Sequence, residues 1–317
     1  MSDVKIQKLG GLLLIAGVVV ALALANSPFE SAYHAFAELE WLKGAAIFIF
    51  FASIGIELRH EITHGVLSKP RQAVVPVFAA IGGMAVPATI FLLINKDTPN
   101  AVGWGVPMST DIAFALSVFV IIANRLPKSI RTLLLAIAVV DDALSILIIT
   151  FFYASEFHLL SVVSLAGVLV GVFMPKGQTA LPTIQKIVNL AALPLFALMS
   201  AGIVFAHIDF STVLLSPLAI GIIVAAVIGK PLGVLGTIAA VTKSKLGKLS
   251  PDVKWADLIP VGFLFGMCFT VALLISELAF GHNESSANTA KLSIFIAATT
   301  AALIASIAMQ VRKLSRV

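Results

Sequence analysis

The sequence predicts an all-α polytopic membrane protein with about ten transmembrane helices. Of its 317 residues, 59% are hydrophobic and only 12% are charged, and the mean hydropathy is +1.06. The apolar residues occur in runs of about twenty, the length of a helix that crosses a bilayer. These runs lack the alternation of apolar and polar residues that strands of outer-membrane barrels show.

Composition also limits the classes of function. The net charge of +5 comes from Lys and Arg residues spread over short loops, so no basic patch suggests a nucleic-acid partner. The one cysteine, Cys268, excludes an internal disulfide. No glycine motif for a nucleotide or phosphate is present. We therefore expect a protein whose partner is the lipid bilayer, with neither a cofactor nor an enzymatic activity.

The N-terminal apolar run, Leu9 to Ala25, has two interpretations. Lys5 and Lys8 precede it and it ends in Ala-Leu-Ala, which resembles a cleavable signal peptide. The run is longer than the usual apolar core of such a peptide. We therefore interpret it as the first transmembrane helix.

Charged residues, prolines and glycines divide the rest of the chain into further apolar runs. A helix satisfies its own backbone hydrogen bonds, which the lipid environment requires. The ten predicted helices are Leu9–Ala25, Leu42–Ile56, Ala73–Ile94, Val102–Ile122, Ile130–Phe152, Leu159–Met174, Ile187–Val204, Leu214–Val241, Leu258–Phe280 and Leu292–Val311.

Loop charges predict the orientation of these helices, because Lys and Arg concentrate on the cytoplasmic side. One set of alternate loops and termini carries 17 basic residues and the other carries three, with Lys230 inside a span. This asymmetry predicts that both termini lie in the cytoplasm. The 17 residues are Lys5, Lys8, Arg59, Lys69, Arg71, Arg125, Lys128, Arg131, Lys176, Lys186, Lys243, Lys245, Lys248, Lys254, Arg312, Lys313 and Arg316, and the three are Lys43, Lys96 and Lys291.

The two halves of the chain show a weak internal repeat, with three matches in the same order. Each half has five predicted helices, an odd number, so the second half enters the membrane in the opposite orientation. We expect a single domain over 1–317 with inverted repeats at about 9–152 and 159–311. The matches pair Leu14-Ile-Ala-Gly-Val-Val-Val with Leu165-Ala-Gly-Val-Leu-Val, Ala45-Ala-Ile-Phe with Ala191-Ala-Leu-Pro, and the region of Ala79 to Pro87 with that of Ala225 to Gly233.

The fourth helix of each half contains a predicted interruption. Glycines and a proline at 103–107 precede Asp111, and glycines at 262 and 266 lie at the matching place. Paired interruptions point to a transport site between the halves, formed by a crossed pair of broken helices. Half-helix ends carry partial charges, and we expect Asp111 to offset the positive ends and Lys230 the negative ends.

The run Leu133–Ile149 carries two adjacent carboxylates, Asp141 and Asp142, at its midpoint. Asp111 and Lys230 lie within other spans. A charged side chain at the centre of an inserted helix costs roughly 2.5 to 3.5 kcal/mol, so four cost roughly 12 kcal/mol. A buried ion pair that fixes helix register would account for Lys230 and one aspartate only. We therefore expect these charges to be functional.

Carboxylate, hydroxyl and carbonyl oxygens suit a small hard cation such as Na+ or Li+. Asp111, Asp141 and Asp142, with Thr110 and carbonyls freed at a break, supply such oxygens. Consecutive helical residues point about 100° apart, so the paired aspartates have different tasks. We assign the cation to Asp142 and pairing with Lys230 to Asp141, although the sequence alone allows the reverse.

The same oxygens suit a second ligand, the proton. Burial and neighbouring like charge both favour the protonated form of a carboxylate. Buried carboxylates can therefore hold either protons or a metal cation. With a site that opens alternately to each side, this competition is sufficient for cation/proton exchange.

Several motifs resemble those of the bacterial NhaA-type Na+/H+ antiporters. They occur in family order over nearly the whole chain, and Asp-Asp together with Gly-Lys-Pro is specific. NhaA is itself an example from which inverted repeats with broken helices are known, so agreement on that point is not independent. The motifs are Gly55-Ile-Glu57-Leu-Arg59, Arg71-Gln-Ala-Val-Val-Pro76, Ala80-Ile-Gly-Gly-Met-Ala-Val-Pro87, Thr110-Asp-Ile-Ala-Phe-Ala115, Ala138-Val-Val-Asp-Asp142, Leu193-Pro-Leu-Phe196, Gly229-Lys-Pro-Leu-Gly233 and Phe269-Thr270.

The resemblance implies an electrogenic antiporter of the bacterial inner membrane. It would exchange cytoplasmic Na+ or Li+ for external H+, be activated at alkaline pH and serve pH and sodium homeostasis. Asp142 with Asp141 would bind the cation and protons, Asp111 and Thr110 would support the site, and Lys230 would balance charge or carry a proton. The resemblance also implies a homodimer, through contacts that the sequence does not locate.

The chain departs from the family pattern in four respects. Family members usually have twelve helices, and about two are absent here between Phe152 and Ser164. The family's histidine associated with the pH response aligns with Val162, which cannot titrate. Cys268 replaces a small glycine beside the second break, and Glu277 occupies a position that is usually uncharged.

A cluster at the cytoplasmic end of the second span is a candidate for the pH response. It contains two histidines, which titrate nearest neutrality. Glu57 is its strongest member, because the family motif matches there, although a solvated helix end would also explain the cluster. Its members are Glu57, Arg59, His60, Glu61 and His64.

Two other functions stay open. Two five-helix halves joined directly resemble the ten-helix sodium/bile-acid symporters, which suggests Na+-coupled symport of an organic anion. The loss of two helices also leaves open a non-transporting, degenerate relative. Cation-dependent fluxes of protons and of organic anions would separate the three hypotheses.

Overall fold

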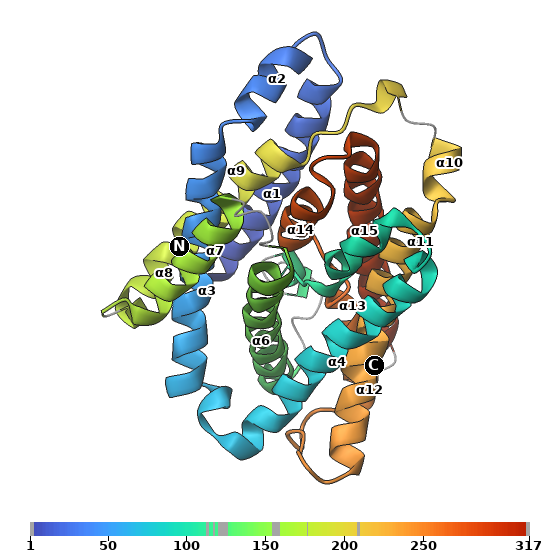
Figure 1. Cartoon of the computed structure of the whole chain (residues 1–317). Coiled ribbons are helices and arrows are strands. Elements are labelled where there is room, and N and C mark those ends of the chain that lie inside the picture. Colours follow the sequence, from blue (N-terminus) through green and yellow to red (C-terminus); the bar gives the residue numbers. More distant parts are fainter. Residues whose placement is uncertain are drawn as a thin grey trace.

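The regular structure of the protein is helical throughout the residues that the computed structural model describes, and the helices pack as one bundle (Figure 1). Seven helical runs in this part of the chain are long and apolar enough to cross a membrane, and three shorter apolar helices accompany them. The fold is therefore the predicted all-α polytopic membrane protein. The described residues are 3–111, 114–116, 118–119, 126–153, 159–175, 177–207 and 210–314.

In the first half of the chain, the long helices contain the predicted spans. The fourth predicted span, Val102–Ile122, is interrupted after Met108. The short helix α2 is not among the predicted elements, because its eight residues are too few to cross a bilayer. The elements are α1 (Asp3–Ala25), α2 (Glu30–Ala37), α3 (Glu40–Thr63), η1 (Val66–Ser68), α4 (Pro70–Asn95), η2 (Pro99–Met108) and α6 (Lys128–Phe152).

In the second half, the predicted span Ile187–Val204 differs most from the structure. The helix begins at Gly177 and ends at Ser200, because its polar first turns, which a search for apolar runs omits, pack against α3. The elements are α7 (Leu159–Phe173), α8 (Gly177–Ile187), η3 (Val188–Ala192), α9 (Leu193–Ser200), η4 (Phe205–His207), α10 (Phe210–Leu214), α11 (Pro217–Val224), η5 (Ala225–Gly229), α12 (Lys230–Lys243), α13 (Trp255–Leu264), α14 (Thr270–Phe280) and α15 (Glu284–Leu314).

Packing between the two halves is reciprocal. Helix α1 packs against α9, and α3 packs against α7, so the first span of each half lies on the second span of the other. The third spans, α4 and α11–α12, also pack against each other. Inverted repeats of five spans, which stay a prediction, would give contacts of this kind. Helix α6 ends at Phe152 and α7 begins at Leu159, close to the predicted repeat bounds.

Helices α4 and α12 meet backbone to backbone at two glycines. A Cβ atom at Gly82 would lie 2.8 Å from the carbonyl oxygen of Gly233, and one at Gly233 would collide with the carbonyl oxygen of Gly82. Non-bonded heavy atoms need about 3.5 Å. Small residues at this contact therefore permit the close approach that is typical of membrane helices.

The two ends of the molecule differ in charge. One end, at the top of Figure 1, carries α2, the start of α3 and the end of α14, and we name it the α2 end. The other end carries the turn at 64–69 and the segment 244–254, and we name it the basic end. Exposed basic side chains at the basic end include Arg59, Lys69, Arg71, Lys243, Lys245, Lys248 and Lys254.

Candidate ion-binding site

Two interrupted helices meet inside the bundle. The chain leaves its helical path after η2 and again between α13 and α14. The backbone N–H of Asp111 donates to the carbonyl of Met267 at 2.8 Å, and the hydroxyl of Thr110 donates to the carbonyl of Phe265 at 3.0 Å. The two predicted breaks therefore lie against each other. Donors of the first break bond to carbonyl groups of the second, which have left their helical path.

The Asp111 carboxylate, which is 4% exposed, caps helices on both sides of this contact. One oxygen accepts from the N–H of Phe114 at 3.0 Å. The other accepts from Thr270, the first residue of α14, through the N–H at 3.3 Å and the hydroxyl at 2.9 Å. A carboxylate at a helix start binds unpaired N–H groups and offsets the positive end of the helix. Asp111 therefore holds the two breaks together.

Lys230, at the start of α12, contacts an aspartate and a helix end. Its side chain is 1% exposed. The ammonium group donates to Oδ2 of Asp141 at 2.7 Å and also to the carbonyl of Met108, the last residue of η2. The C-terminal end of a helix is partially negative. Lys230 thus lies between two negative groups and attracts both.

Asp142, the next residue of α6, lies in a different environment. It is 3% exposed, and its Oδ1 has no hydrogen-bond partner among the described residues. Within the same ranges, the buried hydroxyls of Ser145, one turn along α6, and of Ser109, in the first break, also lack a partner. Buried polar atoms are normally satisfied by protein, water or an ion. These oxygens are therefore suited to a small polar ligand.

Several charged groups act on Asp142. Asp141, Glu57 and Asp111 repel its negative charge, whereas Lys230 attracts it. Because Lys230 already neutralises Asp141, the charge of Asp142 is only partly compensated. A buried carboxylate in this environment is stabilised by binding either a proton or a cation.

The three buried aspartates do not form one cage. Among the described residues, no group of three or more His, Cys, Asp or Glu side chains is placed to hold a metal ion. Asp111 is bonded to Thr270, and Asp141 is bonded to Lys230 and lies beside Thr110. The structure therefore separates residues that the sequence analysis groups together, and Asp142 is the least engaged of the three.

Glu57 lies in the last turns of α3, toward the basic end. Its half-buried carboxylate accepts a hydrogen bond from Nε2 of Gln185 at 2.9 Å. In the same cluster, Arg59 donates to the carbonyl of Val172 at 3.1 Å, and His64 contacts a glutamine of α8 at 3.0 Å. The cluster therefore joins α3 to the second half of the chain.

Three residues of this region are not among the site residues chosen from the sequence. Thr270 bonds to Asp111, and Ser109 and Ser145 have buried unpaired hydroxyls. Such hydroxyls usually bond within their own helix, so composition does not mark them. The available signal for Thr270 is its place at the second break, matching Thr110 at the first.

Sequence comparison identifies the protein family. The chain matches the profile of the family Na+/H+ antiporter 1 over residues 2–179 and 163–309. It belongs to this family. The two matches share residues 163–179, so the Na+/H+ antiporter 1 profile does not run through the middle of the chain as one match.

Three Na(+)/H(+) antiporters named NhaA are similar to this chain over most of its length. The Na(+)/H(+) antiporter NhaA of Arthrobacter sp. (strain FB24) is 33% identical over 386 residues, which cover 96% of this chain and 84% of the relative. NhaA of Shewanella amazonensis is 32% identical over 365 residues, with coverage of 94% and 93%. NhaA of Thermobifida fusca is 33% identical over 380 residues, with coverage of 96% and 91%.

These alignments also bear on the number of helices. Each is longer than the 317 residues of the chain, so the relatives contain residues without a counterpart here. This length difference is compatible with the predicted absence of about two helices between Phe152 and Ser164. The structure places α6 and α7 directly one after the other at that point.

Proposed function

We propose that this protein is a secondary active transporter that exchanges cytoplasmic Na+ for external H+. Membership of the Na+/H+ antiporter 1 family and the names of its relatives support this function. One structural observation carries it: Asp141 forms an ion pair with Lys230, whereas the adjacent Asp142 is also buried but forms no ion pair among the described residues. A purely structural ion pair explains the first carboxylate and not the second.

Asp142 is the residue that we assign to the exchanged ions. Its carboxylate holds Na+ when the site is loaded from the cytoplasm and a proton when it is loaded from outside. The hydroxyls of Ser109 and Ser145 offer neutral oxygens, which a small hard cation accepts as ligands. Because the two ions compete for the same oxygens, one leaves when the other binds.

Asp141 and Lys230 supply the second part of the exchange. A cation at Asp142 repels the ammonium group of Lys230, which favours separation of Lys230 from Asp141. Lys230 therefore balances the charge of the site when the cation is absent. Asp111 and Thr110 support the site by holding the two breaks in contact.

Alternating access requires the two halves of the chain to move relative to each other. The breaks are held together by Thr110, Asp111 and Thr270 across the predicted repeat boundary. The site thus lies where a movement of one repeat against the other changes which side it faces.

We place the protein in the bacterial inner membrane as a multi-pass protein with both termini in the cytoplasm. The exposed lysines and arginines at the basic end support this orientation. We also propose that Li+ can replace Na+, that exchange increases at alkaline pH with Glu57 contributing to the response, and that the exchange serves pH and sodium homeostasis. Ions are the substrates, and no cofactor is proposed.

A flux measurement tests this function. In everted vesicles with a preformed pH gradient, addition of Na+ or Li+ should dissipate the gradient, whereas choline, a large organic cation, should not. Uptake of an organic anion with Na+ and without proton movement would indicate symport instead. Proteoliposomes without cation-dependent flux at any pH would indicate a non-transporting relative.

A further inference from the structure

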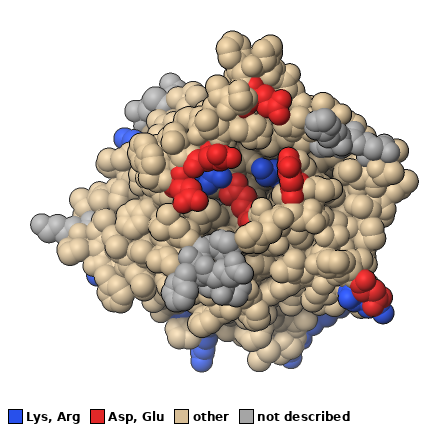
Figure 2. Space-filling view, turned by 45° about the horizontal axis from the view of Figure 1, so that its top comes forward, with Lys and Arg blue, Asp and Glu red and all other residues tan. Residues whose placement is uncertain are grey.

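A second group of charged side chains lies near the α2 end, apart from the candidate ion-binding site. Lys43, in the first turn of α3, forms an ion pair with Glu277 of α14 at 3.0 Å. The two side chains are 15% and 18% exposed. Lys291 and Glu284, both on α15, add further charges around the pair. Figure 2, which is tilted toward this end, shows acidic and basic side chains together in a hollow.

The ion pair is aligned with the site along two helices. Glu277 follows Thr270 by seven residues in α14, which is about two turns, or about 10 Å, along one face. Thr270 is bonded to Asp111. Lys43 likewise precedes Phe50 by seven residues on one face of α3. The faces of α3 and α14 that carry the ion pair therefore extend from the α2 end toward the broken helices.

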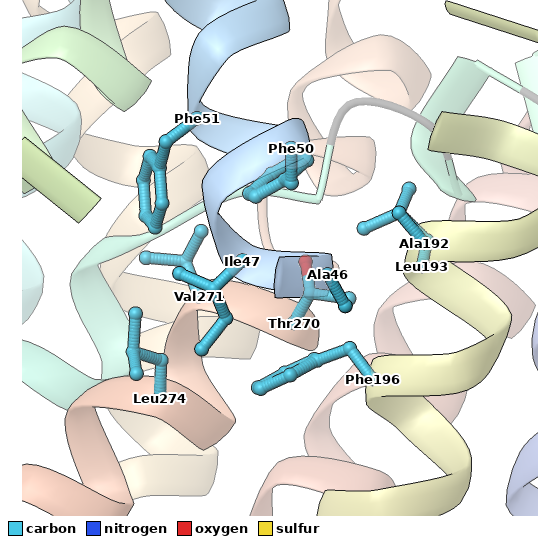
Figure 3. Close-up of a pocket in the computed structure, with 10 residues that line it drawn as sticks. All are labelled: Ala46, Ile47, Phe50, Phe51, Ala192, Leu193, Phe196, Thr270, Val271 and Leu274. Carbon is cyan, nitrogen blue, oxygen red and sulfur yellow. The ribbon is translucent and has the colours of Figure 1, made fainter. Parts of the chain in front are cut away.

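A narrow apolar layer lies between the ion pair and the site. Figure 3 shows side chains from α3, the end of η3, α9 and α14 around a small pocket. Its volume is about 10 Å³, room for about one water molecule. Thr270 is the only polar residue among those that line it, which are Ala46, Ile47, Phe50, Phe51, Ala192, Leu193, Phe196, Thr270, Val271 and Leu274. An ion moving from Thr270 toward the α2 end is therefore blocked by this layer.

We propose that the Lys43–Glu277 ion pair is the outer gate of the transport pathway. It closes the α2 end while the site is accessible from the cytoplasm, and it separates when the site opens outward. This inference rests on the proposed function and on the orientation proposed with it. Lys43 belongs to the first predicted repeat and Glu277 to the second, so movement of one repeat against the other pulls the two charges apart.

Lys291 contributes to the same gate. It lies on α15, in the same predicted repeat as Glu277, and its charge interacts with that of Glu277. When Lys43 moves away, Lys291 remains as a partner for the carboxylate. The carboxylate of Glu277 thus exchanges one ammonium group for another when the gate opens.

A gate differs from a merely stabilising pair in a measurable way. An interaction of equal strength in both conformations shifts no equilibrium between them, whereas a pair present only in the outward-closed state favours that state. Removal of the gate should therefore expose the apolar layer to the outside. Leu274, which is 2% exposed and lies one turn below Glu277, is a suitable position for a reporter cysteine.

The experiment measures labelling of Leu274→Cys by a membrane-impermeant methanethiosulfonate cation added outside right-side-out vesicles. The chain without the reporter gives the baseline for the buried Cys268. Labelling should become about tenfold faster when Glu277→Gln or Lys43→Gln is added. The charge swap Lys43→Glu with Glu277→Lys should restore slow labelling. Glu38→Gln, an exposed change of the same charge at the α2 end, should leave the rate unaltered.

An unchanged labelling rate in both single variants would overturn the proposed gate. The proposal would also fail if labelling became faster only from the cytoplasmic side, as measured in everted vesicles. If these variants do not fold, the double variant Lys43→Cys with Glu277→Cys provides a second measurement. Cross-linking should stop outward exposure of the site until reduction, and exchange at the rate of the reduced protein would contradict the proposal. Labelling needs no transported ion, so a failure of the gate and a failure of the proposed exchange are distinguishable.

Discussion

Lys230 donates a hydrogen bond of 2.7 Å to Asp141 and makes none with Asp142, the adjacent residue of α6, in the part of the chain that the structure describes. Consecutive helical residues point about 100° apart, so one carboxylate faces the ammonium group and the other does not. Lys230 therefore compensates the charge of Asp141, and we propose that an exchanged ion compensates that of Asp142. The expected behaviour of the site variants follows from this division.

Asp142→Asn should abolish exchange. The amide has no negative charge to hold a cation and cannot exchange a proton, so we expect the rate of Na+-driven proton flux to fall by about 100-fold or more. Folding should be retained, because the change removes a buried charge. The gradient assay in everted vesicles measures the first effect and thermal unfolding in detergent the second. Exchange at the normal rate would contradict the assignment of the cation to Asp142 and would favour Asp141 instead.

Lys230→Gln should destabilise the protein. It leaves Asp141 as a buried charge without its partner, which costs about 3–5 kcal/mol. Adding Asp141→Asn should recover most of this loss, because the unpaired charge is then removed. Titration with SDS measures the free energy of unfolding of each variant. Losses that simply add in the double variant would show that the two side chains are not coupled.

Thr270→Val should weaken the contact between the broken helices. It removes the hydroxyl that donates to Asp111 at 2.9 Å, at a cost of about 1.5–3 kcal/mol for a bond to a charged group, and it should lower the exchange rate. Thr242→Val is the matched control, because the Thr242 hydroxyl bonds within its own helix, to Ile238 at 2.8 Å. The control should change stability by no more than about 0.5 kcal/mol. Equal effects of both variants would contradict the role of Thr270.

Gly233→Ala and Gly236→Ala should have opposite effects on stability. A Cβ at Gly233 collides with the backbone of α4 at Gly82, so we expect a loss of about 1–3 kcal/mol. Gly236, three residues along the same helix, has no atom within 4 Å of an added Cβ. Alanine there should stabilise the helix by about 0.5–1 kcal/mol. The same SDS titration compares the two, and a stabilising Gly233→Ala would exclude the close contact between α4 and α12.

Glu57→Gln should make exchange less dependent on pH. It removes a titratable group between α3 and α8 while keeping a side chain that can bond to Gln185. Proton flux measured across the pH range around neutrality should rise less steeply with pH than in the unmodified protein. Glu40→Gln, an exposed change in the first turn of α3 and at its opposite end, is the comparison and should keep the original profile. If the pH profile of exchange in Glu57→Gln were unaltered, the cluster around Glu57 would have a structural role only.

Local composition was sufficient to predict the apolar spans, the interruptions and the presence of four charges inside the bundle. Each of these depends on the cost of placing a given residue in lipid, which the residue and its immediate neighbours determine. The family motifs, being short and contiguous, are also contained in the sequence. The short helix α2 escaped prediction because it is too short to span a bilayer, and the start of α8 because it is too polar to mark a span.

Contacts between distant residues were decided by the tertiary structure. Asp111 and Thr270 are 159 residues apart, and Lys43 and Glu277 are 234 apart. Which side chains face each other depends on how the helices of the two halves are rotated and packed, and a local stretch of sequence does not specify either. For the same reason, the sequence identified three aspartates for one site, while packing bonded Asp111 to a helix start, paired Asp141 with Lys230, and left Asp142 without an ion pair among the described residues.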